Sequence, residues 1–97
     1  MNHYSHDYYS GFFLKQGEVN AKMFLLLVDI SSIRSVKVIN ALVEYFVYGE
    51  TRNVACQKYN VNPGYLSIKI KELQLLWRKL IEITPYVTSD FTEVIKQ

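Results

Sequence analysis

The side chains best suited to chemistry in this 97-residue chain are the polar and cationic ones between residues 51 and 76. Arginine, lysine, hydroxyl and amide groups all donate hydrogen bonds to phosphate oxygens, and a helix N-terminus adds backbone N–H donors. These residue types indicate binding to a polyanion rather than catalysis. The candidate contact residues are Arg52, Cys56, Asn62, Gly64, Tyr65, Ser67, Lys69 and Lys71.

The sequence does not indicate an enzyme. The four glycines are scattered, so they form no phosphate-binding loop, and no nucleophile lies beside a plausible base. His3, His6 and Asp7 are close in sequence, but two histidines in an irregular arm make a poor metal site. The single cysteine, Cys56, excludes an internal disulfide and a multi-cysteine zinc site. We therefore expect no catalytic residue, metal, cofactor or small-molecule ligand.

The pattern of residues 51–76 predicts a helix-turn-helix. Thr51 is placed to cap the first helix, Asn60 to Asn62 form the turn, and Asn62 caps a second helix that opens with Pro63. Such a unit presents the start of its second helix to a nucleic-acid groove, although the same spacing also occurs in helical bundles that bind no DNA. The inward positions are Ala55, Cys56, Tyr59, the turn plug Val61, Leu66, Ile70 and Leu73.

The charge of the chain is concentrated in the same region. The whole chain carries a formal charge of +2, but residues 49–84 hold six basic residues against three acidic ones, whereas residues 1–48 are neutral overall. Phosphate binding requires such a surplus. A surplus of +3 is small for a protein that binds alone, so we expect several copies to bind together.

The remaining elements are predicted from hydrophobic periodicity. Residues 1–18 have no regular period and are expected to form a flexible arm. Asn20 can cap a helix over residues 21–30, although the apolar run there also suits a short strand. Ser32 can cap a helix over residues 33–48, with one face made by Val36, Ile39, Val43 and Phe46.

The last predicted helix begins at Pro63 and ends near Thr84, because Pro85 follows. Residues 87–97 are expected to be a frayed tail, which leaves residues 19–86 as one small all-α domain of four helices. No apolar run is long enough to span a bilayer. The last helix is apolar on more than one side, which indicates either burial within the monomer or an oligomer interface of Leu76, Trp77, Leu80 and Ile83.

Residues 24–86 are similar to the PapB/FocB group of fimbrial-operon transcription regulators. The most specific match is the run Arg-x-x-x-Cys-x-Lys-Tyr-x-x-Asn-x-Gly-Tyr-x-Ser, which begins at Arg52 and ends at Ser67. The resemblance implies a bacterial cytoplasmic regulator that binds AT-rich double-stranded DNA as an oligomer, in phase-variable control of adhesin genes. It ties Arg52 and Cys56 to DNA binding and links the family to the minor groove. It implies nothing for residues 1–18.

Two functions are therefore weighed. The first is a sequence-selective DNA-binding regulator of fimbrial genes that occupies AT-rich repeats cooperatively as an oligomer. The alternative is a helical protein–protein interaction module that binds no DNA and uses the apolar stripe of its last helix.

Overall fold

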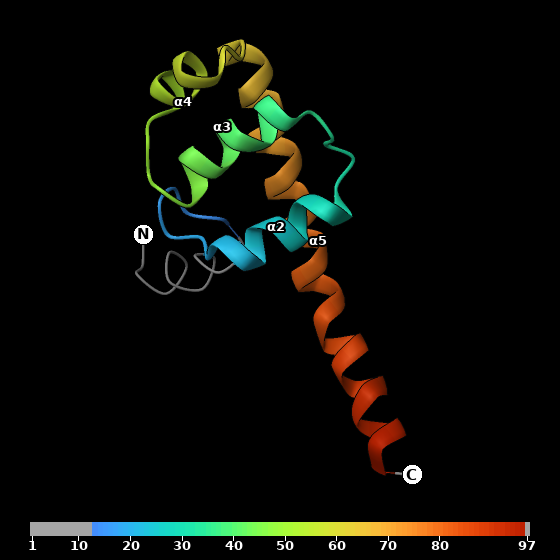
Figure 1. Ribbon diagram of the computed structural model, residues 1–97. Coiled ribbons are helices and arrows are strands. Elements are labelled where there is room, and N and C mark those ends of the chain that lie inside the picture. Colours follow the sequence, from blue (N-terminus) through green and yellow to red (C-terminus); the bar gives the residue numbers. More distant parts are fainter. Residues whose placement is uncertain (1–12, 97) are drawn as a thin grey trace, which may run out of the picture.

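The computed structural model describes residues 13–96, and the side chains of residues 13–88. Over this range the chain forms four helices: α2 (Ala21–Ile30), α3 (Val36–Phe46), α4 (Arg52–Tyr59) and α5 (Pro63–Lys96). Figure 1 shows α2, α3 and α4 gathered around the first half of α5, while the second half of α5 extends away from them. The prediction of an all-α, four-helix fold is confirmed. Within this range no helix combines the length and apolar content needed to cross a bilayer.

Helix α2 has the bounds predicted for it, and it is a helix rather than a strand. The Asn20 side chain accepts a hydrogen bond from the Met23 N–H at 3.0 Å, as an N-cap residue should. Phe24 and Leu27 are buried on its inner face with Val28. The rings of Phe24 and Phe46 of α3 lie 5.4 Å apart between centroids, so α2 and α3 share one core.

Helix α3 is shorter than predicted, because its cap is Ser35 rather than Ser32. The Ser35 hydroxyl accepts from the Val38 N–H, whereas Ile33 is buried in the connection before the helix. The predicted inner position Val36 is 71% exposed. Apolar residues occur on several sides of α3, so periodicity alone could not select the buried side, which is formed by Val38, Ala41, Leu42 and Phe46 with Ile39 and Val43 partly buried.

Residues 13–19, which we call the N-terminal strap, pack on the helices. Leu14 and Val19 are each only 7% exposed. The Leu14 N–H donates to Gln74 Oε1 at 2.7 Å, and Gln74 Nε2 donates to the Leu14 carbonyl at 2.8 Å. The prediction of a flexible arm over residues 1–18 is therefore wrong for its last six residues, because these bury apolar side chains and pair their backbone. Its first twelve lie outside the described residues.

The strap also holds the connection between α3 and α4. The Gly17 N–H donates to the Tyr45 carbonyl at 3.1 Å, and Gln16 Nε2 donates to the carbonyls of Gly49 and Glu50. Gly17 and Gly49 both have positive φ, and a Cβ on Gly17 would lie 2.9 Å from the Gly49 Cα. Only two glycines allow this approach.

Helix α5 does not end at Pro85 and residues 87–96 are helical, so both the predicted helix end and the predicted frayed tail are wrong. Proline removes one N–H donor and leaves the Ile81 carbonyl without its usual partner. Residues 82–88 are all exposed, so water can satisfy that carbonyl. The helix can therefore continue, at some cost in stability.

Candidate nucleic-acid interface

The two helices and the turn of the motif lie at the predicted residues. The Thr51 hydroxyl accepts from the Val54 N–H at 3.2 Å and so caps α4. Asn60 ends α4 in the left-handed conformation, with φ 56° and ψ 52°. The Asn62 side chain then accepts from the Tyr65 N–H at 3.0 Å and caps α5. Thr51 fixes the start of α4, and the Asn60 conformation and the Asn62 cap fix the bend between α4 and α5.

The inward residues of the motif also match the prediction. Ala55, Cys56, Val61, Leu66 and Leu73 are buried, and Tyr59 and Ile70 are partly buried. Cys56 is only 3% exposed, and burial raises the pKa of its thiol, an effect that the nearby Arg52 charge partly opposes. Its place inside the motif gives Cys56 a packing role between α4 and α5 rather than a surface for a ligand.

Arg52 joins the two motif helices on their outer side. Its Nη1 donates to Ser67 Oγ at 2.6 Å, which ties the first turn of α4 to the second turn of α5. Lys71 follows Ser67 by four residues, so both lie on the same flank of α5. We call Arg52, Ser67 and Lys71 the Arg52 flank. Over the described residues no ion pair involves Arg52 or Lys71.

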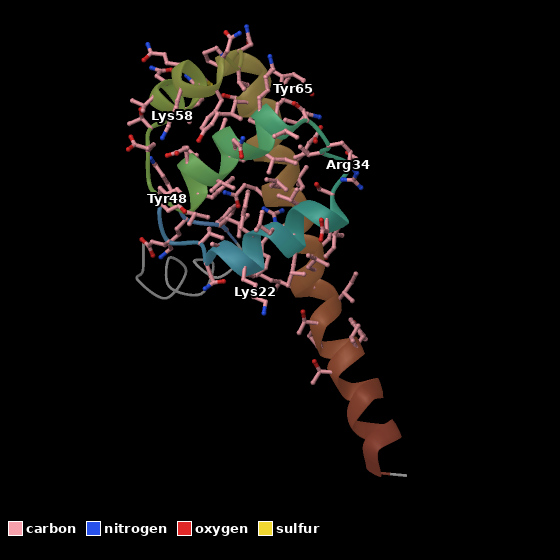
Figure 2. All side chains as sticks on the ribbon, viewed as in Figure 1. Lys22, Arg34, Tyr48, Lys58 and Tyr65 are labelled. Atoms are coloured by element: carbon pink, nitrogen blue, oxygen red, sulfur yellow. The ribbon has the colours of Figure 1, made fainter. Side chains whose placement is uncertain are left out.

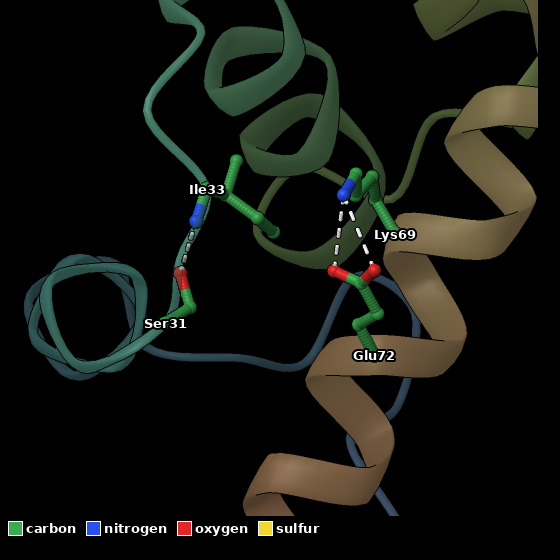
Figure 3. Close-up of polar contacts among 4 residues, drawn as sticks. All are labelled: Ser31, Ile33, Lys69 and Glu72. Atoms are coloured by element: carbon green, nitrogen blue, oxygen red, sulfur yellow. Dashed lines mark hydrogen bonds and ion pairs between the residues drawn. The ribbon is translucent and has the colours of Figure 1, made fainter.

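Tyr65 and Lys69 lie on the opposite flank of α5, because residues two apart on a helix are about 200° apart around its axis. Lys69 Nζ donates to both oxygens of Glu72 at 3.2 Å (Figure 3), and it lies 5.1 Å from the Tyr65 ring centroid. The Glu72 hydrogen bond raises the pKa of Lys69. Figure 2 shows Tyr65 on the same side of the molecule as Arg34. The structure thus divides the predicted contact residues between two flanks.

Asn62 and Gly64 lie where α5 begins. The Asn62 side-chain oxygen is used by its capping bond, so it serves the helix first. A Cβ on Gly64 would lie 3.1 Å from that oxygen, so a larger residue would press on the cap. Gly64 is exposed and leaves the backbone of the first turn open to a ligand.

Two lysines, Lys58 and Lys37, make contacts that could not be predicted from the sequence. Lys58 Nζ lies 2.8 Å from Oε1 of the buried Glu44, which also accepts from the Tyr59 hydroxyl at 3.2 Å. The hydrogen bond from Lys58 lowers the pKa of Glu44 against the opposing effect of burial. Lys37 Nζ donates to the Asn60 carbonyl at 3.2 Å and so brings a cation from α3 to the turn of the motif. Only the charged Glu44 within an apolar stretch hints at the first contact.

Comparison with known proteins identifies the relatives of the chain. Residues 3–87 match the family model PapB, described as an adhesin biosynthesis transcription regulatory protein. The chain belongs to the PapB family. Curated relatives include regulatory protein FanB of Escherichia coli, which is 51% identical over 73% of this chain and 72% of FanB. Another is the pilus operon regulator PapB of Escherichia coli, which is 38% identical over 79% of this chain and 74% of PapB.

A solved structure of a relative has the same fold. The crystal structure of Escherichia coli FocB matches with a TM-score of 0.71 and 34% identity, over 84% of this chain and 92% of FocB. The PapB family consists of transcription regulatory proteins, so this chain is a transcription regulator and not an enzyme. His3, His6 and Asp7 lie outside the described residues, and among those described no cluster of three metal-ligating side chains occurs.

The predicted oligomer residues of this PapB-family chain differ in their surroundings. Leu76, Trp77 and Leu80 are partly buried against the core of the same chain, whereas Ile83 is 49% exposed. Burial within the monomer therefore accounts for much of the apolar stripe. The exposed apolar side chains available to a second copy are Leu25, Leu26 and Ile30 on α2 and Leu75, Ile83, Tyr86 and Val87 on α5.

Proposed function

We propose that this PapB-family regulator controls fimbrial (adhesin) genes in the bacterial cytoplasm by binding AT-rich double-stranded DNA through its helix-turn-helix. The observation that carries the proposal is the Arg52–Ser67 bond, which holds a cation outside the junction of α4 and α5. Lys71 lies on the same flank, and the described residues offer neither cation a carboxylate partner. A fixed cation that lacks a protein counter-ion is suited to a phosphate or to the negative minor groove of an A-tract.

The other candidate residues support this surface in different ways. Asn62 and Gly64 shape the N-terminus of α5, where the exposed Gly64 N–H can bind a phosphate, whereas the Tyr65 and Leu66 N–H groups already donate to Asn62. Cys56 is buried inside the motif, so the size of its side chain determines how closely α4 and α5 pack. Tyr65 and Lys69 lie on the other flank and act as peripheral contacts.

We further propose that the protein binds repeated DNA sites cooperatively as an oligomer. Two of the four basic residues in the motif, Lys58 and Lys69, are paired with carboxylates, so the motif of one copy offers only two unpaired cations among the described residues. Neighbouring copies add their contacts, and exposed apolar side chains on α2 and α5 provide surfaces for association. Occupancy that rises steeply with concentration suits the phase-variable expression of adhesins.

The test is a titration of DNA binding across salt concentrations with an AT-rich repeat. The logarithm of the binding constant should fall linearly with the logarithm of salt concentration, and Arg52→Gln should reduce the slope by about 0.9 per lost phosphate contact. Lys22→Gln removes the same charge from α2, away from the motif (Figure 2), and should leave the slope unchanged. A flat slope for the unchanged protein would contradict DNA binding.

A second variant separates charge from geometry. Ser67→Ala removes the hydroxyl that holds Arg52 but keeps the guanidinium. We expect a weaker complex with the same salt slope, because the phosphate contact remains but is less well oriented. An equal loss of slope in Ser67→Ala and Arg52→Gln would show that the guanidinium reaches the phosphate only when Ser67 holds it, whereas an unchanged slope in Arg52→Gln would show that the guanidinium does not bind DNA directly.

The exposed apolar side chains also support the alternative of a protein interaction module without DNA binding. Light scattering without nucleic acid, combined with the Arg52→Gln variant, distinguishes the two functions. For the module, the mass of the complex would be unaffected by Arg52→Gln and no DNA would be retained.

A further inference from the structure

A single row of polar side chains extends the Arg52 flank along α5. Ser67, Lys71, Gln74 and Arg78 are spaced by four, three and four residues, so they share one face of the helix. The strap crosses this row, because the Leu14 backbone is paired with the Gln74 amide.

The strap reaches Arg78 through Phe13. The Arg78 guanidinium carbon lies 5.6 Å from the Phe13 ring centroid, and the ring is 47% exposed. Phe13, Lys71, Gln74, Leu75 and Arg78 together line a groove on the surface. Lys71 and Arg78 differ from Lys58 and Lys69, since within the described part of the chain no ion pair involves either.

We propose that this groove is a second DNA contact, in which Lys71 and Arg78 bind phosphates of the strand that continues beyond the helix-turn-helix. The inference rests on the proposed function, and it adds Arg78 as a binding residue and Phe13 as its positioning residue. Seven residues separate the two cations, about 10.5 Å along the helix axis. This distance corresponds to the rise of about three nucleotides, at 3.4 Å each along the duplex axis.

Two observations favour the DNA backbone over an acidic peptide as the occupant. The groove continues the Arg52 flank without a break, since Lys71 belongs to both. Among the residues that the structure describes, both charged residues of the groove are cations and no acidic side chain lines it. A DNA strand bound at Arg52 would therefore meet the same sign of charge further along α5.

Phe13 gives Arg78 a defined orientation. A guanidinium over an aromatic face is attracted to the ring while its N–H groups remain free in its own plane. Those N–H groups can then donate to two oxygens of one phosphate. Phe13 does not itself need to touch DNA in this arrangement.

The first experiment compares Arg78→Gln with Lys79→Gln, binding an AT-rich duplex longer than the helix-turn-helix site. Arg78→Gln should lower the salt slope by about 0.9 and weaken binding severalfold. Lys79→Gln removes the same charge one residue away, about 100° around the helix, and should leave the slope unchanged. An unchanged slope in Arg78→Gln, with normal helicity, would overturn the proposal while leaving the Arg52 contact standing.

The second experiment tests Phe13 as a positioning residue. Phe13→Ala should weaken DNA binding in the unchanged protein but have almost no further effect in Arg78→Gln, because its only role in binding acts through Arg78. Phe13→Tyr keeps the aromatic face and should restore binding. Equal losses from Phe13→Ala in both backgrounds would show a general structural effect and contradict the positioning role.

Analytical ultracentrifugation without DNA completes the test. An unchanged mass for Arg78→Gln, together with its reduced slope, supports a DNA contact. A smaller mass for Arg78→Gln would show that the groove holds a second copy of the protein instead, which would overturn the proposal. A binding constant of the unchanged protein that does not vary with salt concentration would instead contradict the proposed function, DNA binding by the motif.

Discussion

The two flanks of α5 carry similar residue types but present very different charges. On one flank Lys69 donates to Glu72 and lies beside Tyr65, so its charge is compensated within the protein. On the other, Arg52 donates to the neutral hydroxyl of Ser67, and within the described residues neither Arg52 nor Lys71 takes part in an ion pair. The cations that can bind a polyanion are those that the fold leaves without a counter-ion, and a count of basic residues overstates them.

The largest expected effect comes from the core beneath both flanks. Leu66 of α5 is fully buried in the core, so Leu66→Ala should lower the free energy of unfolding by about 2–5 kcal/mol. Thermal and urea unfolding measure this loss. The DNA contacts of the two flanks can be compared only in variants that keep this core. A decrease in the free energy of unfolding below about 1 kcal/mol would contradict the packing described for Leu66.

The next effect compares the flanks directly. Lys71→Gln should weaken DNA binding severalfold and reduce the salt slope by about 0.9, because an unpaired cation is lost. The double variant Lys69→Gln with Glu72→Gln keeps the net charge and removes a compensated pair. It should change affinity by less than about twofold, because Glu72 already compensates the charge of Lys69. Equal effects would show that the flanks do not differ.

The smallest effect concerns Lys58, which like Lys69 is paired with a carboxylate. The Lys58 hydrogen bond lowers the pKa of Glu44 in the folded protein, so this contact stabilises the fold above the ordinary carboxyl pKa. The stabilisation should disappear as pH falls through the lowered pKa and Glu44 becomes protonated. Thermal unfolding between pH 7 and pH 3 should therefore show a weaker pH dependence in Glu44→Gln. Identical profiles for the two proteins would show that Glu44 does not contribute.

The parts of the fold that the sequence predicted are those set by local contacts. Asn20, Thr51 and Asn62 each cap a helix through a bond to the third residue along, so their positions could be recognised from neighbouring residues alone. The turn plug Val61 is buried for the same reason. The predicted start of α3 is wrong because Ser32 and Ser35 are equally good N-cap residues in the sequence. Only the burial of Ile33 distinguishes the two serines.

The candidate site was predicted less completely, because its geometry depends on contacts distant in sequence. Arg52 and Ser67 are 15 residues apart, and Leu14 and Gln74 are 60 apart. The sequence shows the residue type of each of these four side chains, but it does not show which distant residue each one contacts. The helix-turn-helix residues were found as a set, whereas their division between two flanks required the structure.

The contact between Gly17 and Gly49 has a practical consequence for shortening the protein. A version that starts at Asn20 would keep the sequence of all four helices, yet it would expose the apolar core side chains that Leu14 and Val19 cover. It would also remove the Gln16 hydrogen bond to the loop before α4. We therefore expect the smallest independently folding unit to include the N-terminal strap. Random substitution should find these two glycines hard to replace, because both have positive φ and their backbones approach closely.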